Sequence, residues 1–404
     1  MTNSPGIVVV GAGLAAAKAI ETLREEGYEG AITLIGDGAE RPYERPALSK
    51  DYLQGKQSSE DLFVHPADWY TEHQIETHFG DAAVAIDRSL RLVTLASGTT
   101  VHYEQLLLAT GSRPNTLSIP GADLAGVFSL RTLHDSDKIR TSFAEAKKLV
   151  VIGAGWIGLE TAAAARAAGL DVTVLESAAL PLQRVLGDEL ATYFAELHRA
   201  NGVDLRTSVS VTSLEGADGH VTAVRVGDES IPADMVILGI GISPNAELAA
   251  EAGIAVDNGI TVDEQLRTSD AAVFAAGDVA NAHNTAVHAR IRVEHWDNAI
   301  RQGKLAAKSM LGEQVTYDWQ PYFYTDQFDL GMEYVGYAST DDDVLIRGDK
   351  DSGEFIAFWL AGEVVKAGMN VNVWDVNDDI RALIGTTVDP ATLANPDIAL
   401  SDQT

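Results

Sequence analysis

Two glycine-rich segments, residues 11–16 and residues 153–158, have the spacing that binds the pyrophosphate of a dinucleotide. In each, the first glycine makes a tight turn and the second lets backbone N–H groups approach the phosphates. The third small residue lets the following helix pack closely on the preceding strand, with its positive end toward the phosphates. One such segment is weak evidence, but two predict two bound nucleotides. The candidate residues are Gly11, Gly13, Leu14, Ala15 and Ala16 in the first segment and Gly153, Gly155, Ile157 and Gly158 in the second.

An acidic residue follows each segment at the end of the next apolar run, Asp37 after the first and Glu176 after the second. A carboxylate at this position accepts hydrogen bonds from ribose hydroxyls and repels a 2′-phosphate. The pattern therefore favours NADH over NADPH, and Arg184 is the main residue that argues the other way. The alternative is that both acids only end strands on a solvated face.

The elements that must position these residues have the order strand, glycine turn, helix, strand. The first set comprises a β-branched run at residues 7–10, an alanine-rich helix reaching about Glu26 and a strand at residues 31–35. The second set comprises residues 149–152, a helix to Gly169 and a strand at residues 171–176. Each set is a βαβ unit, and nothing else in the chain repeats.

Two further strands are predicted to end in glycine turns near the first nucleotide. Residues 106–108 run into Ala109, Thr110 and Gly111, and residues 268–276 lead through Gly277 to Asp278. Alone, this Gly-Asp pair is only a turn signal. Residues 234–238 form another strand, whose turn contains Gly241 and can carry the chain back to the first domain.

These elements predict an α/β fold with two Rossmann-like dinucleotide-binding domains and a C-terminal α+β domain with an antiparallel sheet. Short alternating segments such as residues 354–360 indicate that sheet. The predicted boundaries are residues 1–112 with 240–316 for a discontinuous first nucleotide-binding domain, 113–239 for the second nucleotide-binding domain and 317–404 for the third domain. The tail beyond Thr387 is predicted to be a loosely packed extension.

The composition excludes several classes of function. The chain has no cysteine among its 404 residues, which removes thiol catalysis, disulfides and cysteine-ligated metal sites, so redox chemistry requires a bound cofactor. A net charge of -30 argues against nucleic-acid and anionic-lipid partners. No apolar run is long enough to cross a bilayer, and the first apolar run indicates a buried strand rather than a signal peptide, so the expected compartment is the cytoplasm.

The order of these motifs resembles the glutathione-reductase-like flavoproteins that bind two dinucleotides. Within that fold, residues 41–50 closely resemble the flavin-side helix of the NADH–ferredoxin reductases of oxygenase systems, so a helix is expected at residues 45–50. Further matches are residues 131–133, 241–245, 292–296 and 321–327, so that the resemblance reaches to about Thr387. Relatives that use a disulfide carry two cysteines on the helix where this chain has residues 46–50, and none is present here. The resemblance therefore implies that electrons leave the flavin directly.

The resemblance also implies site residues and a partner. FAD contacts are expected from the first glycine segment and from Asp37, Arg45, Lys50, Val84, Ala109, Thr110, Gly111, Arg131, Gly277, Asp278 and Trp296. NADH contacts are expected from the second segment and from Glu160, Glu176 and Gly241. Lys50 and Glu160 are the candidate catalytic residues, paired near the flavin and the nicotinamide. The alternative for Lys50 is a surface lysine. NADH would reduce FAD, which would pass single electrons to a [2Fe-2S] ferredoxin that serves a cytochrome P450 or a Rieske oxygenase.

A docking surface for an acidic ferredoxin requires local positive charge on this acidic chain. Arg301, Lys304 and Lys308 have helical spacing and supply it, although such a row is more often a solvated face. The alternatives are an NADH-dependent rubredoxin or quinone reductase or an NADH oxidase, and, from another class, an interaction protein like apoptosis-inducing factor. The protein is expected to be a monomer or a homodimer. No metal site is expected, because His283, His288 and His295 lack compact ligand spacing.

Overall fold

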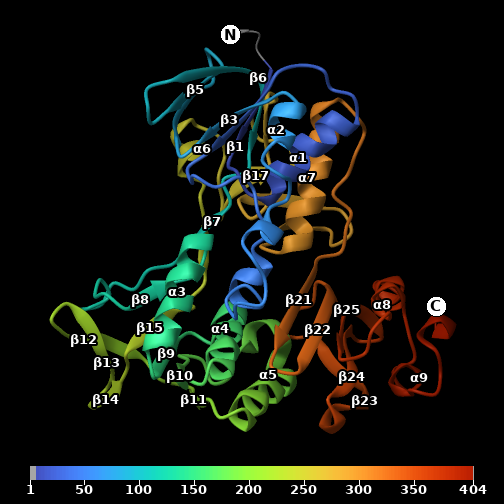
Figure 1. Ribbon diagram of the computed structural model, residues 1–404. Helices are drawn as coiled ribbons and strands as arrows, with labels where there is room; N and C mark the ends of the chain where they lie inside the picture. The colour runs from blue at the N-terminus through green and yellow to red at the C-terminus, as the bar shows by residue number, and fades with distance from the viewer. Residues whose placement is uncertain (1–5, 404) are drawn as a thin grey trace. The chain divides into compact units, whose positions relative to one another are not determined.

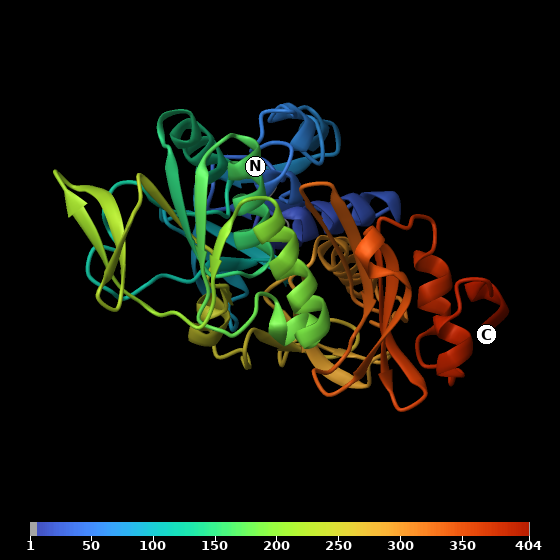
Figure 2. The same ribbon diagram turned by 90° about the horizontal axis from the view of Figure 1, so that it is seen from below.

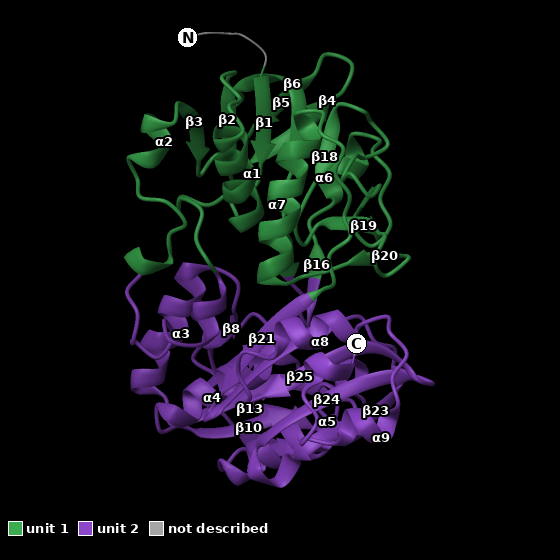
Figure 3. Ribbon diagram, turned by 90° about the vertical axis from the view of Figure 1, so that its right-hand side faces the viewer, with its two compact units in different colours: residues 1–44, 60–113, 243–321 green, residues 45–59, 114–242, 322–404 purple. Residues whose placement is uncertain are grey.

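The structure is a computed structural model that describes residues 6–403. The described chain forms two compact units, which are coloured separately in Figure 3. Unit 1 contains the residues up to Glu44, Glu60–Arg113 and Ser243–Pro321, and unit 2 contains Arg45–Ser59, Pro114–Ile242 and the chain from Tyr322. The C-terminal sheet thus groups with the second glycine segment, and the three domain boundaries given above stay a prediction. The chain passes between the units in β7 (Ser112–Pro114) and β16 (Ile242–Pro244).

Unit 1 is built on a mixed sheet whose central strands are parallel. They lie in the order β3 (Ile75–Phe79), β2 (Ile32–Gly36), β1 (Gly6–Val10), β6 (Thr100–Leu108), and β18 (Val273–Ala275) also pairs with β6. Two antiparallel strands extend the sheet beyond β6, namely β5 (Leu92–Leu95) and β4 (Ala83–Asp87). The central strands are buried, as their β-branched runs predict.

Two long helices of unit 1, α1 (Leu14–Glu25) and α7 (Trp296–Met310), lie side by side (Figure 1). They approach closely because α1 presents alanines and α7 presents Gly303, where a Cβ atom would lie 2.4 Å from the carbonyl oxygen of Ala15. The smaller elements are η2 (Glu60–Leu62), α2 (Trp69–Glu72), α6 (Glu247–Glu251) and a three-stranded sheet of β17 (Ile260–Val262), β19 (Ala280–Asn284) and β20 (Ala289–Arg292).

Unit 2 contains a second parallel sheet, which carries the second glycine segment. Its order is β11 (Asp204–Arg206), β10 (Asp171–Leu175), β9 (Lys148–Ile152), β15 (Met235–Leu238), β8 (Val127–Ser129). The helices of this part are η1 (Pro46–Ser49), α3 (Leu133–Glu145), α4 (Trp156–Ala167) and α5 (Gln183–Ala200). An antiparallel meander of β12 (Val211–Ala217), β13 (His220–Val226) and β14 (Glu229–Pro232) completes it.

The C-terminal part of unit 2 is the predicted antiparallel sheet. Its order is β21 (Tyr322–Gln327), β22 (Leu330–Gly336), β25 (Val364–Val371), β24 (Glu354–Ala361), β23 (Asp343–Asp349). The remaining elements are η3 (Lys350–Ser352), α8 (Asn377–Leu383), α9 (Pro390–Ala394) and η4 (Leu400–Gln403). The sheet lies beside α5 in Figure 2, and Tyr193 of α5 contacts Phe355 of β24 edge-on at 5.1 Å between ring centroids.

Strand β24 is buried on both faces and separates two apolar cores. One face contributes Phe355, Ala357 and Trp359 to the core shared with α5 and the parallel sheet. The other face contributes Ile356, Phe358 and Leu360 to a core that also contains residues of α8, α9 and η4. Successive side chains of β24 therefore point into two different cores, instead of alternating between a core and solvent.

The prediction of a loosely packed tail beyond Thr387 is wrong. Leu393 and Leu400 are buried in the second core of β24. The guanidinium of Arg347, itself buried, donates hydrogen bonds to backbone carbonyls of Leu393 at 3.0 Å and Asn395 at 2.7 Å. The sequence did not indicate these contacts, because the tail is mostly polar and its few apolar residues are spread over short helices.

The strands and helices predicted around both glycine segments are present, with ends that differ by one or two residues. One prediction needs correction, because residues 46–50 do not form an α-helix; Pro46–Ser49 is a single 3-10 turn with proline at its start. Within residues 6–403, no helix has both the length and the apolar composition of a membrane span.

Candidate functional site

The first glycine segment forms an open cradle between β1 and α1. Gly11 has φ of +106°, and a Cβ atom there would lie 2.1 Å from the carbonyl oxygen of Ala109. Gly13 is the N-cap of α1 in extended conformation, without a side-chain cap. A Cβ atom on Gly13 would have no described atom within 4 Å. The N–H groups of Leu14, Ala15 and Ala16 in the first turn have no acceptor within the helix, and the open space at Gly13 beside them suits a pyrophosphate.

Other predicted FAD residues of unit 1 lie at the carboxyl ends of neighbouring parallel strands. Asp37 follows β2, is exposed and accepts a hydrogen bond from the N–H of Gly38 at 2.9 Å. Thr110 follows β6, and its hydroxyl donates to the carbonyl of Asn245 at 2.7 Å. The Asn245 amide donates back to the carbonyl of Thr110 at 2.9 Å. In an open α/β sheet, ligands bind at such carboxyl ends.

The Gly277-Asp278 turn after β18 is held firmly in unit 1. The N–H of Gly277 donates to the side-chain oxygen of Gln302 at 2.9 Å, and Asp278 accepts from the hydroxyl of Ser112 at 2.7 Å. Trp296 begins α7, and Val84 of β4 is an apolar side chain with 49% of its surface exposed. A cofactor that covered Val84 would remove this apolar surface from water.

The second glycine segment repeats this geometry in unit 2. Gly153 has φ of +99°, and a Cβ atom on Gly158 would lie 2.2 Å from the carbonyl oxygen of Gly153. Gly155 is the extended N-cap of α4, again without a side-chain cap, and its Cβ position is open apart from one atom at 3.9 Å. Ile157 is 44% exposed in the first turn of α4. The cradle therefore also fits a pyrophosphate.

Glu176 stabilises this second cradle. One carboxylate oxygen accepts from the N–H of Ala154 and the other from the N–H of Ala178, both at 2.7 Å. A carboxylate has about four acceptor positions, so capacity remains for ribose hydroxyls. Gly241, which has φ of +88°, lies in the turn after β15. In that turn the amide of Asn115 donates to the carbonyl of Ile240 at 3.1 Å.

Lys50 and Glu160 form a buried ion pair within unit 2, as the sequence predicts. The Lys50 Nζ and Glu160 Oε1 atoms are 2.8 Å apart, and the two side chains are only 12% and 3% exposed. Glu160 also accepts from the hydroxyls of Ser49 at 2.5 Å and Thr325 at 2.6 Å. Lys50 ends the 3-10 turn η1, while Glu160 lies in α4, and the ring centroid of Tyr324 is 5.3 Å from Nζ. Three donors thus satisfy a carboxylate that burial alone would destabilise.

Arg45 and Arg131 lie together at the other end of η1. The Arg45 guanidinium donates to the carbonyl of Arg131 at 2.5 Å. The backbone of Arg131 leads into α3, which begins with a reciprocal capping box between Thr132 and Asp135. Arg45, Lys50 and Arg131 therefore belong to unit 2, whereas the other predicted FAD residues belong to unit 1.

Sequence reasoning missed the polar residues that surround Glu160. Ser49 and Thr325 bind Glu160 directly, Gln327 binds Thr325 and His198 binds Gln327, and all four side chains are buried. The only available signal was the alternation along residues 322–327, which places Thr325 and Gln327 on the same face of a strand. His198 lies on α5 and had no distinguishing motif.

The three cations predicted for docking lie on α7, but two of them have acidic partners in unit 1. Arg301 pairs with Asp297 at 2.7 Å, and Lys308 pairs with Glu26 at 2.9 Å. Lys304 is exposed and has no ion pair with any residue in the range 6–403. The net positive charge of this row therefore centres on Lys304.

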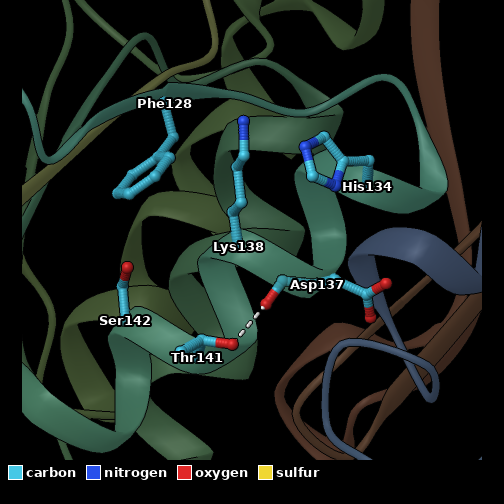
Figure 4. A pocket seen from close by; sticks show the side chains of 6 residues that line it. All are labelled: Phe128, His134, Asp137, Lys138, Thr141 and Ser142. Atoms are coloured by element: carbon cyan, nitrogen blue, oxygen red, sulfur yellow. Dashed lines mark hydrogen bonds between the residues drawn. The ribbon is translucent and has the colours of Figure 1, made fainter.

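A separate pocket of about 320 Å³ lies on α3 in unit 2 (Figure 4). Its lining residues are Phe128, His134, Asp137, Lys138, Thr141 and Ser142, and none of them is a predicted site residue. Groups of three or more metal-ligating side chains are absent from the described part of the chain, including the region of His283, His288 and His295.

The two cradles, each between a parallel strand and an uncapped helix, define a reductase of the type that binds two dinucleotides. The chain belongs to the pyridine nucleotide-disulphide oxidoreductase family, whose model matches residues 5–303. A second model, described as the reductase C-terminal domain, matches residues 322–404. Family membership confirms the predicted fold class and the assignment as an NADH-dependent flavoprotein oxidoreductase with FAD and NADH as cofactors.

Similar proteins cover nearly the whole chain. Rhodocoxin reductase from Rhodococcus erythropolis is 40% identical over 367 residues, which are 91% of this chain and 86% of that protein. The ferredoxin–NAD(+) reductase component of the anthranilate 1,2-dioxygenase system of Burkholderia cepacia is 38% identical over 97% of this chain and 98% of its own length. The crystal structure of a covalent putidaredoxin reductase–putidaredoxin complex matches with a TM-score of 0.95, 36% identity and coverage of 99% and 98%.

Proposed function

We propose that this protein is an NADH:ferredoxin oxidoreductase that passes electrons from NADH through FAD to a [2Fe-2S] ferredoxin of an oxygenase system. The observation that carries the proposal is the η1 turn, which offers Glu160 a hydroxyl and an ammonium group from Ser49 and Lys50. In relatives that use a disulfide, this position carries the thiols. Without thiols here, electrons would leave FAD directly for an external acceptor, and the similar proteins are reductases of rhodocoxin, putidaredoxin or a ferredoxin.

FAD would be held mainly by residues of unit 1. The N–H groups after Gly13 would bind the pyrophosphate, Asp37 would accept from a ribose, and Asp278 would accept from the ribityl chain. Val84 and Trp296 would supply apolar contact. The further proposed contacts are Gly11, Leu14, Ala15, Ala16, Ala109, Thr110, Gly111 and Gly277, and the family resemblance adds Arg45, Lys50 and Arg131.

NADH would be held by unit 2. The N–H groups after Gly155 would bind its pyrophosphate, and Glu176 would accept from the adenosine ribose while remaining bound to the loop. The exposed Ile157 would contact the ligand, and Gly241 would leave room for it. Gly153 and Gly158 complete the proposed set of NADH-binding residues and shape the cradle, because their Cβ positions point at backbone carbonyl oxygens.

The Lys50–Glu160 pair would supply a fixed pair of charges to the bound cofactors. Bound FAD would accept two electrons from NADH and release them one at a time. The Lys50 ammonium, held by Glu160, would stabilise negative charge on bound FAD after its reduction. Since the pair is preorganised and largely buried, its charges need little rearrangement during the reaction.

Replacing Lys50 with alanine should slow flavin reduction by NADH about tenfold or more, which corresponds to about 1.4 kcal/mol of lost stabilisation. Stopped-flow absorbance at saturating NADH measures this rate. Because the change leaves Glu160 buried without its ammonium, Lys50→Arg is needed as a variant that keeps the charge. Lys56→Ala is the matched control, since Lys56 lies on the same segment but is 64% exposed. An unchanged rate in Lys50→Ala would refute the electrostatic role.

The identity of the acceptor is tested by mixing the purified yellow protein with NADH and a panel of ferredoxins, rubredoxins and quinones. Coupled cytochrome c reduction should respond to at least one [2Fe-2S] ferredoxin at submicromolar concentration. A response to rubredoxin or quinone alone would assign one of the other reductase functions. A long-lived NADH–flavin complex with no response to any acceptor would favour an interaction protein instead.

We place the ferredoxin contact on α7 around Lys304. Reversing its charge in Lys304→Glu should weaken ferredoxin reduction several-fold at low salt and reduce its salt dependence, because rim charges act mainly on association. Reduction of ferricyanide, a small dye, should be unchanged. Lys308→Glu is the comparison, since Lys308 is already paired with Glu26 and its loss should change the rate less. Equal loss of ferredoxin and dye reduction would contradict docking at this surface.

We further propose that the protein works in the cytoplasm as a monomer or a homodimer, with NADH preferred over NADPH. The preference follows from Glu176, whose bound carboxylate would face a 2′-phosphate with negative charge.

A further inference from the structure

A continuous chain of hydrogen bonds leads from Glu160 to a buried histidine inside unit 2. The Thr325 hydroxyl lies 2.6 Å from Glu160 Oε1, and Gln327 Nε2 lies 3.1 Å from that hydroxyl. Gln327 Oε1 lies 2.8 Å from His198 Nε2. All of these side chains are buried, and His198 is fully so. The chain joins α4, β21 and α5.

The direction of every bond in this chain follows from the Lys50–Glu160 pair. The carboxylate that faces an ammonium only accepts, so the single hydroxyl hydrogen of Thr325 is donated to Glu160. Thr325 must then accept from the Gln327 amide N–H, which turns the Gln327 carbonyl oxygen toward His198. That oxygen only accepts, so His198 donates from Nε2. One orientation of the amide and one tautomer of the imidazole satisfy the whole chain.

The surrounding packing leaves this chain little freedom to change. Thr325 and Gln327 are alternate residues of β21, so both face the interior on the same side of the strand. The ring of Phe328 packs edge-on against the His198 ring at 5.1 Å between centroids. Burial lowers the pKa of His198, while the hydrogen bond to Gln327 acts in the opposite direction.

We propose that Thr325, Gln327 and His198 are positioning residues that hold the Glu160 carboxylate against Lys50 and thereby set the rate of flavin reduction by NADH. The inference rests on the proposed function of the Lys50–Glu160 pair. The carboxylate has about four acceptor positions. Ser49 and Lys50, at the end of η1, use two of them, and Thr325 of β21 uses a third. Removing the Thr325 donor would let the carboxylate rotate away from the ammonium.

The test is Thr325→Val, which keeps the shape and removes the hydroxyl. Stopped-flow flavin reduction at saturating NADH should slow about three- to tenfold, with FAD content unchanged. Thr325→Ser should restore most of the rate. Thr161→Val is the matched control, because Thr161 is equally buried on the helix of Glu160 but bonds only to backbone carbonyls of its own helix. A similar loss in Thr161→Val would assign the effect to general packing and overturn the inference.

A double-mutant cycle separates positioning from stability. Thr325→Val should slow the reaction in the presence of Glu160 and have no further effect in Glu160→Ala, whereas a merely structural role would slow both backgrounds alike. His198→Phe should slow the reaction less than Thr325→Val and add nothing to it. If Thr325→Val does not retain FAD, Gln327→Met carries the same cycle. If Glu160→Ala reduces its flavin at the wild-type rate, the proposed role of the ion pair itself is refuted. If Glu160→Ala is slow but Thr325→Val is not, only the positioning inference is refuted.

Discussion

Replacing Gly13 with leucine should give a folded protein that no longer holds FAD. The Cβ position of Gly13 points into open space, and its backbone is extended, so leucine creates no clash and no strained φ within the described chain. The side chain would, however, fill the space that we assign to the pyrophosphate. The cost to α1 from a poorer N-cap is only about 1 kcal/mol, so the loss of FAD should far exceed the loss of stability.

Flavin content after gel filtration, read from the absorbance ratio at 450 and 280 nm, measures this outcome. The thermal midpoint of the variant should match that of wild-type protein stripped of FAD. Gly11→Ala provides the contrast, because its Cβ atom would meet the Ala109 carbonyl at 2.1 Å and should damage folding itself. Full retention of FAD in Gly13→Leu would show that the pyrophosphate does not bind at this loop.

Replacing Gly155 with leucine should leave FAD bound and abolish its reduction by NADH at ordinary concentrations. The Cβ position at Gly155 is open apart from one atom at 3.9 Å, and it belongs to the cradle assigned to NADH. Loss of the pyrophosphate contacts should weaken NADH binding at least about 100-fold, which corresponds to about 2.7 kcal/mol. The protein should therefore be yellow but unresponsive to NADH.

Dithionite should still reduce the flavin of Gly155→Leu, which distinguishes lost NADH binding from a damaged flavin. The two leucine variants also control each other, since one should lose FAD and the other only the response to NADH. If Gly155→Leu is reduced by NADH at the wild-type rate and concentration, the second cradle does not bind the pyridine nucleotide.

The parts of the fold that follow from local patterns could be predicted from the sequence. Both cradles combine a β-branched run, glycines at fixed spacing and an alanine-rich helix within about 30 residues, so neighbours along the chain determine them. Lys50 and Glu160 were found through the family pattern, because 110 residues separate them and no local rule connects them.

The rest could not be predicted because it depends on contacts between distant segments. Ser49, His198 and Thr325 come from three separate parts of the chain, and no local pattern places them in one hydrogen-bond network with Glu160. The polar composition of the tail beyond Thr387 led to the wrong prediction of loose packing. A few apolar residues such as Leu393 are buried and fix the tail, while many of its polar residues face water.

The two-sided burial of β24 has a consequence for any shortened or fused version of this protein. If the chain were cut after Thr387, the loss of Leu393 and Leu400 would partly uncover the sheet face that carries Phe358. An uncovered apolar sheet face promotes self-association, so such a protein would aggregate before its redox chemistry could be judged. The C-terminal residues therefore act as a solubilising cover for the sheet, although they contain none of the residues assigned to a cofactor.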